Sequence, residues 1–226
     1  MNRQLTLGIQ LSDNIDFSNF LEGKNSELVT VLKTLPAARL DHYVYVQGAK
    51  GAGKSHLLQA SCRNTPASIY LPLREFRQLA PEILDGLERS AQVCLDDIDA
   101  IAGNSQWEEA IFHCFNRLRE NKVSLVISST LSPTCMKLTI PDLQSRLQWG
   151  TSYTLERLLD SEQIEALQLR ATQRGFDLPN ETAGYLLKRV SRQMTDLFDL
   201  LDALDIASLS AQRKLTVPFV KTLLGL

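Results

Sequence analysis

Hydrophobic and polar positions follow two different periods along the first two-thirds of this 226-residue chain. Short runs rich in β-branched and aromatic residues predict strands, and the first strong one is His42–Gln47. The runs Val93–Leu95 and Leu125–Ile127 are continuously apolar, which is typical of strands buried on both faces of a parallel sheet. Helical segments separate the strands, so we predict an α/β fold with a five-stranded parallel core. The other four strands are expected at Ser68–Leu71, Gln92–Asp96, Ser124–Ser128 and Thr151–Leu155.

Helical periodicity marks the segments between the strands and the last third of the chain. From about Asn104 to Glu120, apolar residues recur at spacings of three and four. After about residue 157 only helical patterns remain, with Gly175 closing one helix and Pro218 opening the last. We therefore predict an α/β domain followed by a small helical lid domain, with segments at 1–16, 17–157 and 158–226.

Composition is that of an ordinary globular protein. Hydrophobic residues make up 44% and charged residues 22%, and the formal net charge of −2 gives no overall basic field for holding nucleic acid. The four cysteines form no C-x-x-C unit, so buried free thiols in a reducing cytoplasm are expected. No signal peptide is expected, and no stretch approaches the ~18 apolar residues needed to span a membrane. A cytoplasmic protein without membrane contact is the expectation.

The strongest chemical signal is the segment Gly48–Ser55, which fits the P-loop pattern G-x-x-x-x-G-K-[ST]. Its glycines allow backbone N–H groups to approach phosphate, and the following helix directs its N-terminal amides there. Lys54 supplies a positive charge to the phosphates and Ser55 a hydroxyl to Mg²⁺. The pattern follows a predicted strand and opens a predicted helix, which argues against a glycine-rich turn without a ligand. The predicted nucleotide-binding residues are Gly48, Lys50, Gly51, Ala52, Gly53, Lys54, Ser55 and His56.

A second piece of the same site is expected where the strand Gln92–Asp96 ends. An acid at the end of a buried strand, about 40 residues beyond a P-loop, has the Walker-B arrangement, so Asp96 is the predicted partner of Ser55 at Mg²⁺. Asp97 stands where a residue that activates water would lie. The alternative for Asp97 and Asp99 is that they are solvated loop acids.

These stretches together resemble the AAA+ nucleotide-binding proteins, and among them the family of the bacterial replication initiator DnaA. The resemblance rests on Gly53–Leu58, on Leu95–Ile98 with Ala102-Gly103, and on Ser145–Gly150, which is similar to the S-R-F-x-W-G stretch of the initiator. Within that family the chain looks like a regulator that inactivates the initiator, since nothing after the lid resembles a helix-turn-helix domain. Direct sequence-specific DNA binding is therefore not expected.

The resemblance implies two partner-directed features. Arg146 corresponds to an arginine that points into the nucleotide of a neighbouring subunit and speeds its hydrolysis. The N-terminal residues Gln4, Leu5, Thr6 and Leu7 look like the Q-L-[SD]-L peptide that docks on the sliding clamp of DNA polymerase. Alternating Leu5, Leu7, Ile9 and Leu11 also fit an ordinary edge strand. Side-by-side contact with DnaA is implied, and formation of homo-oligomers stays open.

The chain departs from the AAA+ pattern at positions that favour hydrolysis. Thr195 stands where the lid of the initiator has a sensor arginine, and Arg192 lies three residues earlier on nearly the same helix face. Ser129-Thr130 replaces the Ser-Asp that follows the fourth strand of the initiator, and Asp97 is shorter than the usual glutamate. We therefore expect bound ADP or ATP with Mg²⁺, and weak or absent ATPase activity.

Two other functions are consistent with a P-loop. An autonomous AAA+ ATPase, such as a helicase loader, would turn over ATP by itself. A small-molecule kinase would usually carry an acceptor-binding lid inside the α/β domain, whereas here the additional residues follow it. The residues that select the base are not evident from motifs, and Phe20–Lys24 is our prediction for part of that pocket.

Overall fold

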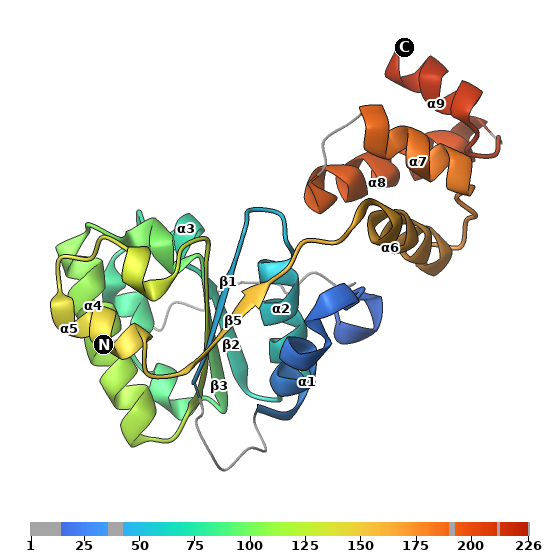
Figure 1. Cartoon of the computed structure of the whole chain (residues 1–226). Coiled ribbons are helices and arrows are strands. Elements are labelled where there is room, and N and C mark those ends of the chain that lie inside the picture. The colour runs from blue at the N-terminus through green and yellow to red at the C-terminus, as the bar shows by residue number, and fades with distance from the viewer. Residues whose placement is uncertain (1–14, 36–42, 190–192, 212, 226) are drawn as a thin grey trace, which may run out of the picture. The chain divides into compact units, whose positions relative to one another are not determined.

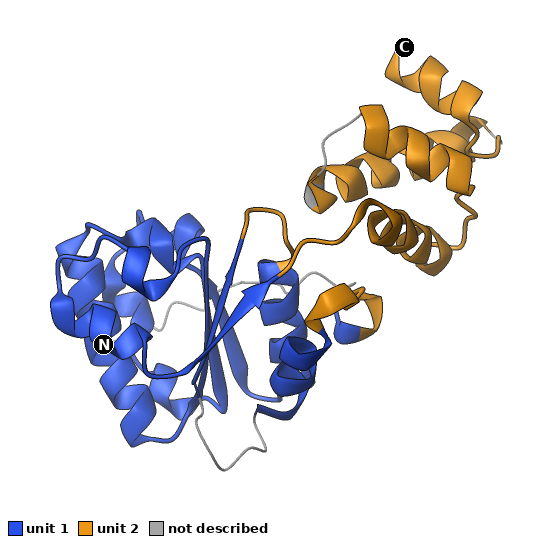
Figure 2. Ribbon diagram, in the orientation of Figure 1, with its two compact units in different colours: residues 1–17, 26–48, 54–155 blue, residues 18–25, 49–53, 156–226 orange. Residues whose placement is uncertain are grey.

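The computed structural model describes residues 15–35, 43–189, 193–211 and 213–225. They form two compact units, which are coloured separately in Figure 2. The first unit contains the described parts of 1–17, 26–48 and 54–155, and the second contains those of 18–25, 49–53 and 156–226. The predicted division at residues 157 and 158 stays a prediction.

A five-stranded sheet with the order β2-β3-β4-β1-β5 forms the centre of the first unit (Figure 1). Each neighbouring pair is parallel, as the continuous apolar runs predict. The strands are β1 (Tyr43–Gly48), β2 (Ser68–Pro72), β3 (Gln92–Asp96), β4 (Ser124–Ser129) and β5 (Thr151–Leu155). Because all strands run the same way, the polar residues that end β3 and β4 meet at one edge of the sheet, together with the last residue of β1.

Helices cover both faces of this sheet (Figure 1): α1 and α2 lie on one face, and α3, α4 and α5 on the other. Their bounds are α1 (Ser26–Thr34), α2 (Lys54–Asn64), α3 (Leu73–Phe76), α4 (Ser105–Glu120) and α5 (Pro141–Leu147). Strand side chains alternate between the layers, so Tyr43 and Tyr45 join the core beneath α4 while Val44 and Val46 are buried on the opposite face. The side chain of Asn104 caps α4 by accepting a hydrogen bond from the backbone N–H of Trp107.

The second unit contains the helical lid, formed by α6 (Asp160–Gln173), α7 (Asn180–Arg189), α8 (Met194–Ala211) and α9 (Val217–Leu224). Leucines from these helices form its core, including Leu197 and Leu201 on α8. Ion pairs join α6 to α8, where Asp202 accepts from Arg170 at 3.1 Å and from Arg174 at 2.7 Å. The predicted helical lid is thereby confirmed.

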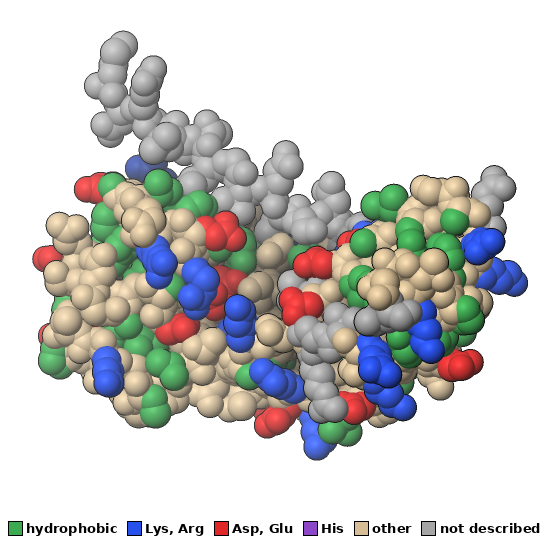
Figure 3. Space-filling view, turned by 90° about the horizontal axis from the view of Figure 1, so that it is seen from above, with side chains coloured by type: hydrophobic (Ala, Val, Ile, Leu, Met, Phe, Trp, Pro, Cys, Tyr) green, Lys and Arg blue, Asp and Glu red, His purple; other side chains and the backbone are tan. Residues whose placement is uncertain are grey.

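The mixed charge of the surface and the burial of the cysteines agree with the expectations from the sequence, except at one cysteine. On the face shown in Figure 3, Lys and Arg are interspersed with Asp and Glu among the described residues. Cys62, Cys94 and Cys114 are buried free thiols as expected, but Cys135 is exposed because it lies in a surface turn after β4. Within the described residues, no helix is long and apolar enough to cross a membrane.

Candidate nucleotide and arginine sites

The P-loop segment between β1 and α2 has the backbone conformation that its glycines predict. Gly51 and Gly53 have φ angles of +77° and +104°, a region in which a side chain is strained. A Cβ atom at Gly53 would lie 2.9 Å from the Phe20 ring, so the loop also has no room for one there. Phe20, which we predicted as part of the base pocket, therefore packs directly against the P-loop glycine.

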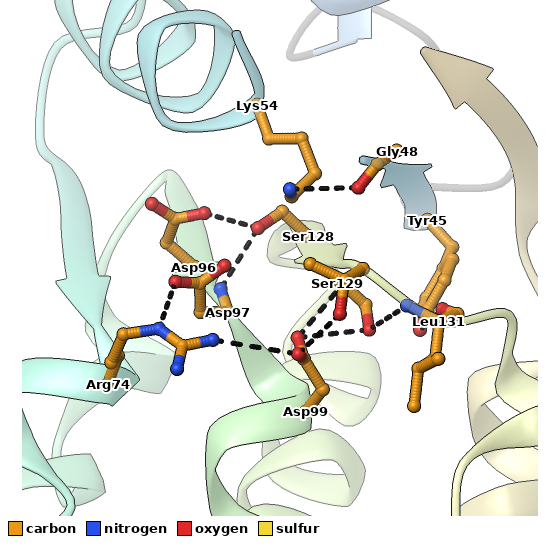
Figure 4. A network of polar contacts seen from close by, with 11 residues as sticks. Tyr45, Gly48, Lys54, Arg74, Asp96, Asp97, Asp99, Ser128, Ser129 and Leu131 are labelled. Carbon is orange, nitrogen blue, oxygen red and sulfur yellow. Dashed lines mark hydrogen bonds and ion pairs between the residues drawn. The ribbon is translucent and has the colours of Figure 1, made fainter. Parts of the chain in front are cut away.

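Lys54 begins α2 and extends its ammonium group back to the end of β1 (Figure 4), where it donates a hydrogen bond of 3.0 Å to the Gly48 carbonyl. Only 6% of Lys54 is exposed. Ser55, the next residue, is exposed in the first turn of the helix. A buried ammonium group at the N-terminus of a helix forms an electropositive site that suits phosphate.

The carboxylate of Asp96 is 3% exposed at the end of β3 and accepts from two hydroxyl groups. Ser128 on β4 donates to one oxygen (Figure 4), and Tyr70 on β2 donates to the other at 2.7 Å. Burial and the nearby negative charge of Asp96 raise the pKa of Tyr70 far above its ordinary value, although side-chain hydrogen bonds with Gln59 and Ser55 oppose the rise. The Tyr70 hydroxyl therefore lies between the two predicted magnesium ligands.

Asp97 adopts a left-handed backbone conformation, with φ at 54°, which turns the chain sharply after β3. Its carboxylate accepts a 2.7 Å hydrogen bond from Nε of Arg74, on α3, and its backbone N–H donates to Ser128 at 2.9 Å. The predicted water-activating residue is thus held in an ion pair (Figure 4). It is not a freely solvated loop acid.

Asp99 extends the same network to the end of β4. It accepts hydrogen bonds from the hydroxyl of Thr130 at 2.7 Å and of Ser129 at 3.1 Å, and Arg74 lies 3.6 Å away. Burial acts to raise the pKa of Asp99, but the hydrogen bonds from Thr130 and Ser129 outweigh it and hold the pKa below its ordinary value. Arg74 therefore joins two carboxylates that follow the Walker-B strand.

The residues at this edge suit Mg²⁺ only in combination with phosphate. Among the described residues, no group of three or more His, Cys, Asp or Glu side chains is placed to hold a metal by itself. Mg²⁺ commonly takes one or two protein oxygens and completes its octahedron with phosphate and water. Asp96 and Ser55, joined through Tyr70, would supply oxygen ligands of that kind.

Arg146 lies near the end of α5 and contacts two aromatic rings. Its guanidinium carbon is 4.9 Å from the ring centroid of Phe112 and 4.6 Å from that of Trp149. The Tyr43 hydroxyl donates to the Leu147 carbonyl at 3.0 Å, and a Cβ at Gly150 would lie 2.5 Å from the Tyr43 carbonyl oxygen. The Ser145–Gly150 stretch is thereby fixed against the first residue of β1.

Two models of known protein families match parts of this chain. A family model described as the bacterial DnaA ATPase domain matches residues 83–154, which include Asp96 and Arg146. A second, described as the lid domain of Hda, matches residues 160–224. The chain is a DnaA-related AAA+ protein. Its lid is of the Hda type.

Solved structures agree with this fold. Domain III of DnaA from Thermotoga maritima has a TM-score of 0.84 at 20% identity, over 96% of this chain and 98% of that one. AMPPCP-bound DnaA from Aquifex aeolicus has a TM-score of 0.68 at 22% identity, over 89% of this chain and 69% of that one. The RuvB branch migration motor of T. maritima has a TM-score of 0.66 at 18% identity, over 94% and 72%. The DnaA-related protein therefore has the nucleotide-binding P-loop fold.

Several predicted residues have separate surroundings or lie outside the described part of the chain. His56 makes a 2.9 Å hydrogen bond with the Asp16 carbonyl, and the Lys50 carbonyl accepts from Arg157 at 3.2 Å. The clamp peptide Gln4–Leu7 and Arg192 are outside the described residues, as is the side chain of Thr195. Their predicted roles stay predictions.

Sequence reasoning missed three side chains of the DnaA-related protein that complete its polar network, namely Tyr70, Arg74 and Ser128. Ser128 could have been found, because a serine at the end of an apolar strand faces the same edge as Asp96. The local sequence pattern predicts only an aromatic residue of a strand for Tyr70 and a solvated helix residue for Arg74. Their roles depend on the register of β2 against β3, in which Tyr70 is opposite Cys94 and Pro72 opposite Asp96.

Proposed function

We propose that this DnaA-related protein is a nucleotide-bound regulator of replication initiation that inactivates DnaA. It docks on the sliding clamp through Gln4–Leu7 and presents Arg146 to ATP bound by DnaA. The arginine stabilises charge that develops on the γ-phosphate and thereby stimulates hydrolysis by the initiator. The presence of a DnaA-type ATPase domain and an Hda-type lid in one chain supports this assignment.

The observation that carries the proposal is the position of Arg146 relative to the phosphate-binding edge of its own sheet. The Ser145–Gly150 stretch is anchored at Tyr43, the first residue of β1, whereas Gly48 ends that strand. Five residues of strand span roughly 16 Å. Because the stretch that carries Arg146 is anchored away from the phosphate-binding edge, with the guanidinium group on Phe112 and Trp149, this arginine serves a nucleotide on another subunit better than its own.

The ion pair of Asp97 supports a nucleotide that regulates the protein rather than one that is hydrolysed in repeated cycles. A general base must be free to accept a proton from water, and the ion pair with Arg74 opposes that in the described conformation. An autonomous ATPase would need this pair to open on every turnover. We therefore assign ADP or ATP with Mg²⁺ as a ligand that sets the conformation, held by the P-loop, with Asp96 and Ser55 at the metal.

The arginine role is tested by measuring ATP hydrolysis by DnaA with clamp-loaded DNA present. Arg146→Ala should bring the stimulated rate down to that of DnaA alone, because a trans arginine contributes about 10³–10⁵ in rate. Arg89→Ala, which removes an exposed arginine of the same unit, is the matched control and should stimulate like wild type. Full stimulation by Arg146→Ala would exclude the finger role.

Clamp docking is tested separately by binding to DNA-loaded clamp. Removal of residues 1–10 should abolish binding, and the double variant Gln4→Ala with Leu7→Ala should weaken it as strongly. The control changes Asn2 and Arg3 to alanine and leaves the four-residue peptide intact. Retention of binding after removal of residues 1–10 would exclude this peptide as the docking element.

The nucleotide itself is identified from purified protein. We expect ADP or ATP to copurify in a Mg²⁺-dependent way, with a turnover slow enough that bound nucleotide survives purification. Brisk hydrolysis in the absence of DnaA would favour the autonomous ATPase instead. Asp96→Asn should reduce the Mg²⁺ dependence of nucleotide binding, which reports on the metal ligand without relying on catalysis.

A further inference from the structure

The surroundings of Arg146 are unusual for a partly buried arginine. No carboxylate in the described part of the chain lies within ion-pair distance of it, and its guanidinium group is held by the rings of Phe112 and Trp149. Ring faces attract a guanidinium group but do not use its N–H donors. The donors of Arg146 therefore stay available for a phosphate.

The ring of Trp149 is itself fixed, although 49% of the residue is exposed. Phe115 on α4 packs against it edge-to-face, with 6.2 Å between centroids, and the guanidinium carbon of Arg119 lies 4.5 Å from its centroid. Gly150, directly after it, is packed so closely on Tyr43 that a Cβ would be 2.3 Å from that ring. A half-exposed tryptophan that is held from both the helix and its own backbone cannot rotate freely away.

One helix supplies most of this arrangement. Phe112, Phe115 and Arg119 follow one another on α4 at spacings of three and four, so they form a single stripe on the helix surface. Arg146 and Trp149 lie against that stripe at the end of α5. We define Phe112 and Trp149 as the arginine cradle.

We propose that the arginine cradle positions Arg146 for a phosphate of the partner and stays in contact with its guanidinium group when that phosphate binds. This inference rests on the proposed function of Arg146. Cation–π contacts at exposed sites contribute about 0.5–1 kcal/mol each, less than a charge-assisted hydrogen bond to phosphate. The cradle is therefore strong enough to limit the conformations of Arg146, and it leaves the N–H donors available for the phosphate.

The position of Arg146 is tested first in the protein by itself. Fluorotryptophan labelling gives two fluorine resonances, because the chain has two tryptophans, and Trp149→Phe assigns them. Arg146→Ala should shift the Trp149 resonance and leave that of Trp107 unchanged. An unchanged Trp149 resonance would exclude the proposed cradle, irrespective of the effect of Arg146 on ATP hydrolysis by DnaA. In the complete assembly, the ring contact should persist, so the Trp149 resonance of wild type bound to ATP-loaded DnaA should stay distinct from that of Arg146→Ala.

The positioning role is tested by the stimulated hydrolysis of DnaA as its concentration is varied. Phe112→Leu should lower the maximal stimulated rate about two- to five-fold, from the loss of one cation–π contact, with little change in the concentration for half-maximal stimulation. Phe112→Tyr keeps a ring face and should restore the rate, and Phe219→Leu on α9 is the control for loss of a half-buried ring.

The outcomes separate the two proposals. If Arg146→Ala abolishes stimulation while Phe112→Leu and Trp149→Leu both act like wild type, the function stands and the cradle is wrong. If Phe112→Tyr fails to rescue, the ring face is not the cause and the cradle is also wrong. If Arg146→Ala stimulates normally, the finger role falls and the cradle role falls with it.

Discussion

Glu108 is a carboxylate on α4 with no exposed surface, and it receives four hydrogen bonds. One oxygen accepts from the backbone N–H of Gly103 at 2.7 Å. The other accepts from the backbone N–H and hydroxyl of Thr139, at 2.7 and 2.6 Å, and from the N–H of Ile140 at 3.0 Å. Glu108 thus ties the turn after the Walker-B strand to the residues that lead into α5.

We predict that Glu108→Ala lowers the free energy of unfolding by about 3–5 kcal/mol. Each buried donor left without an acceptor costs about 1–3 kcal/mol, and water entering the vacated space recovers part of the sum. Glu108→Gln keeps the shape and one acceptor oxygen. If that oxygen faces Thr139 and Ile140, the amide N–H₂ meets the Gly103 N–H, a donor against a donor, and the cost is about 2 kcal/mol.

The assay is urea unfolding followed by tryptophan fluorescence, because Trp107, buried next to Glu108, and Trp149 both lie in the first unit. Glu109→Ala is the matched control, because its side chain is 70% exposed and its carboxylate lies 3.8 Å from His113. The control should change stability by less than about 0.5 kcal/mol. A Glu108→Ala value within 1 kcal/mol of the control, or equal values for the Gln and Ala variants, would refute the reasoning.

Three further outcomes are expected. Arg74→Gln should raise the basal ATP turnover of the purified protein about two- to five-fold, because a partly exposed ion pair of about 0.2–1 kcal/mol no longer holds Asp97. The turnover is measured as phosphate release in the presence of Mg²⁺, and a decrease would contradict the prediction. Asp202→Asn should destabilise the lid by about 1–2 kcal/mol, seen as faster amide exchange in α6 and α8, since two arginines lose a partly buried carboxylate. Burial raises the pKa of Tyr45 from 10.0 to about 12, so its contribution to stability is complete below pH 10 and is lost as the pH rises through 12. Between pH 10 and 12, the free energy of unfolding should therefore fall less for Tyr45→Phe than for wild type.

Local periodicity was enough to predict the strands and the long helices. The run Gln92–Asp96 has the predicted bounds, and the helix predicted from about Asn104 to Glu120 spans Ser105–Glu120, because apolar repeats act within one turn or strand. The Cys135 prediction was wrong for the opposite reason. Its exposure depends on how the turn after β4 meets the rest of the first unit, and no local pattern records that.

The polar networks were beyond local patterns because they join residues far apart in the chain. Arg74 and Asp97 are 23 positions apart, and Glu108 and Thr139 are 31 apart. Glu108 resembles a solvated residue of an amphipathic helix until the loops at Gly103 and Thr139 close over it. Motifs predicted the residues that meet phosphate, whereas the side chains that orient them follow from strand register and loop packing.

The position of Glu108 also bears on the arginine site, because Phe112 is one helical turn further along α4. Glu108 holds the N–H of Ile140 at the start of α5, and Phe112 contacts Arg146 at its end. A single rigid helix thus fixes both ends of the element that carries the proposed finger. Because of this link, Glu108→Gln should lower the stimulation of ATP hydrolysis by DnaA. Unfolding of the variant does not account for such a decrease, since a loss of about 2 kcal/mol from a typical free energy of unfolding of 5–15 kcal/mol leaves the folded fraction near unity. Equal stimulation by Glu108→Gln and wild type would show that the Phe112 and Trp149 contacts set the arginine without help from the start of α5.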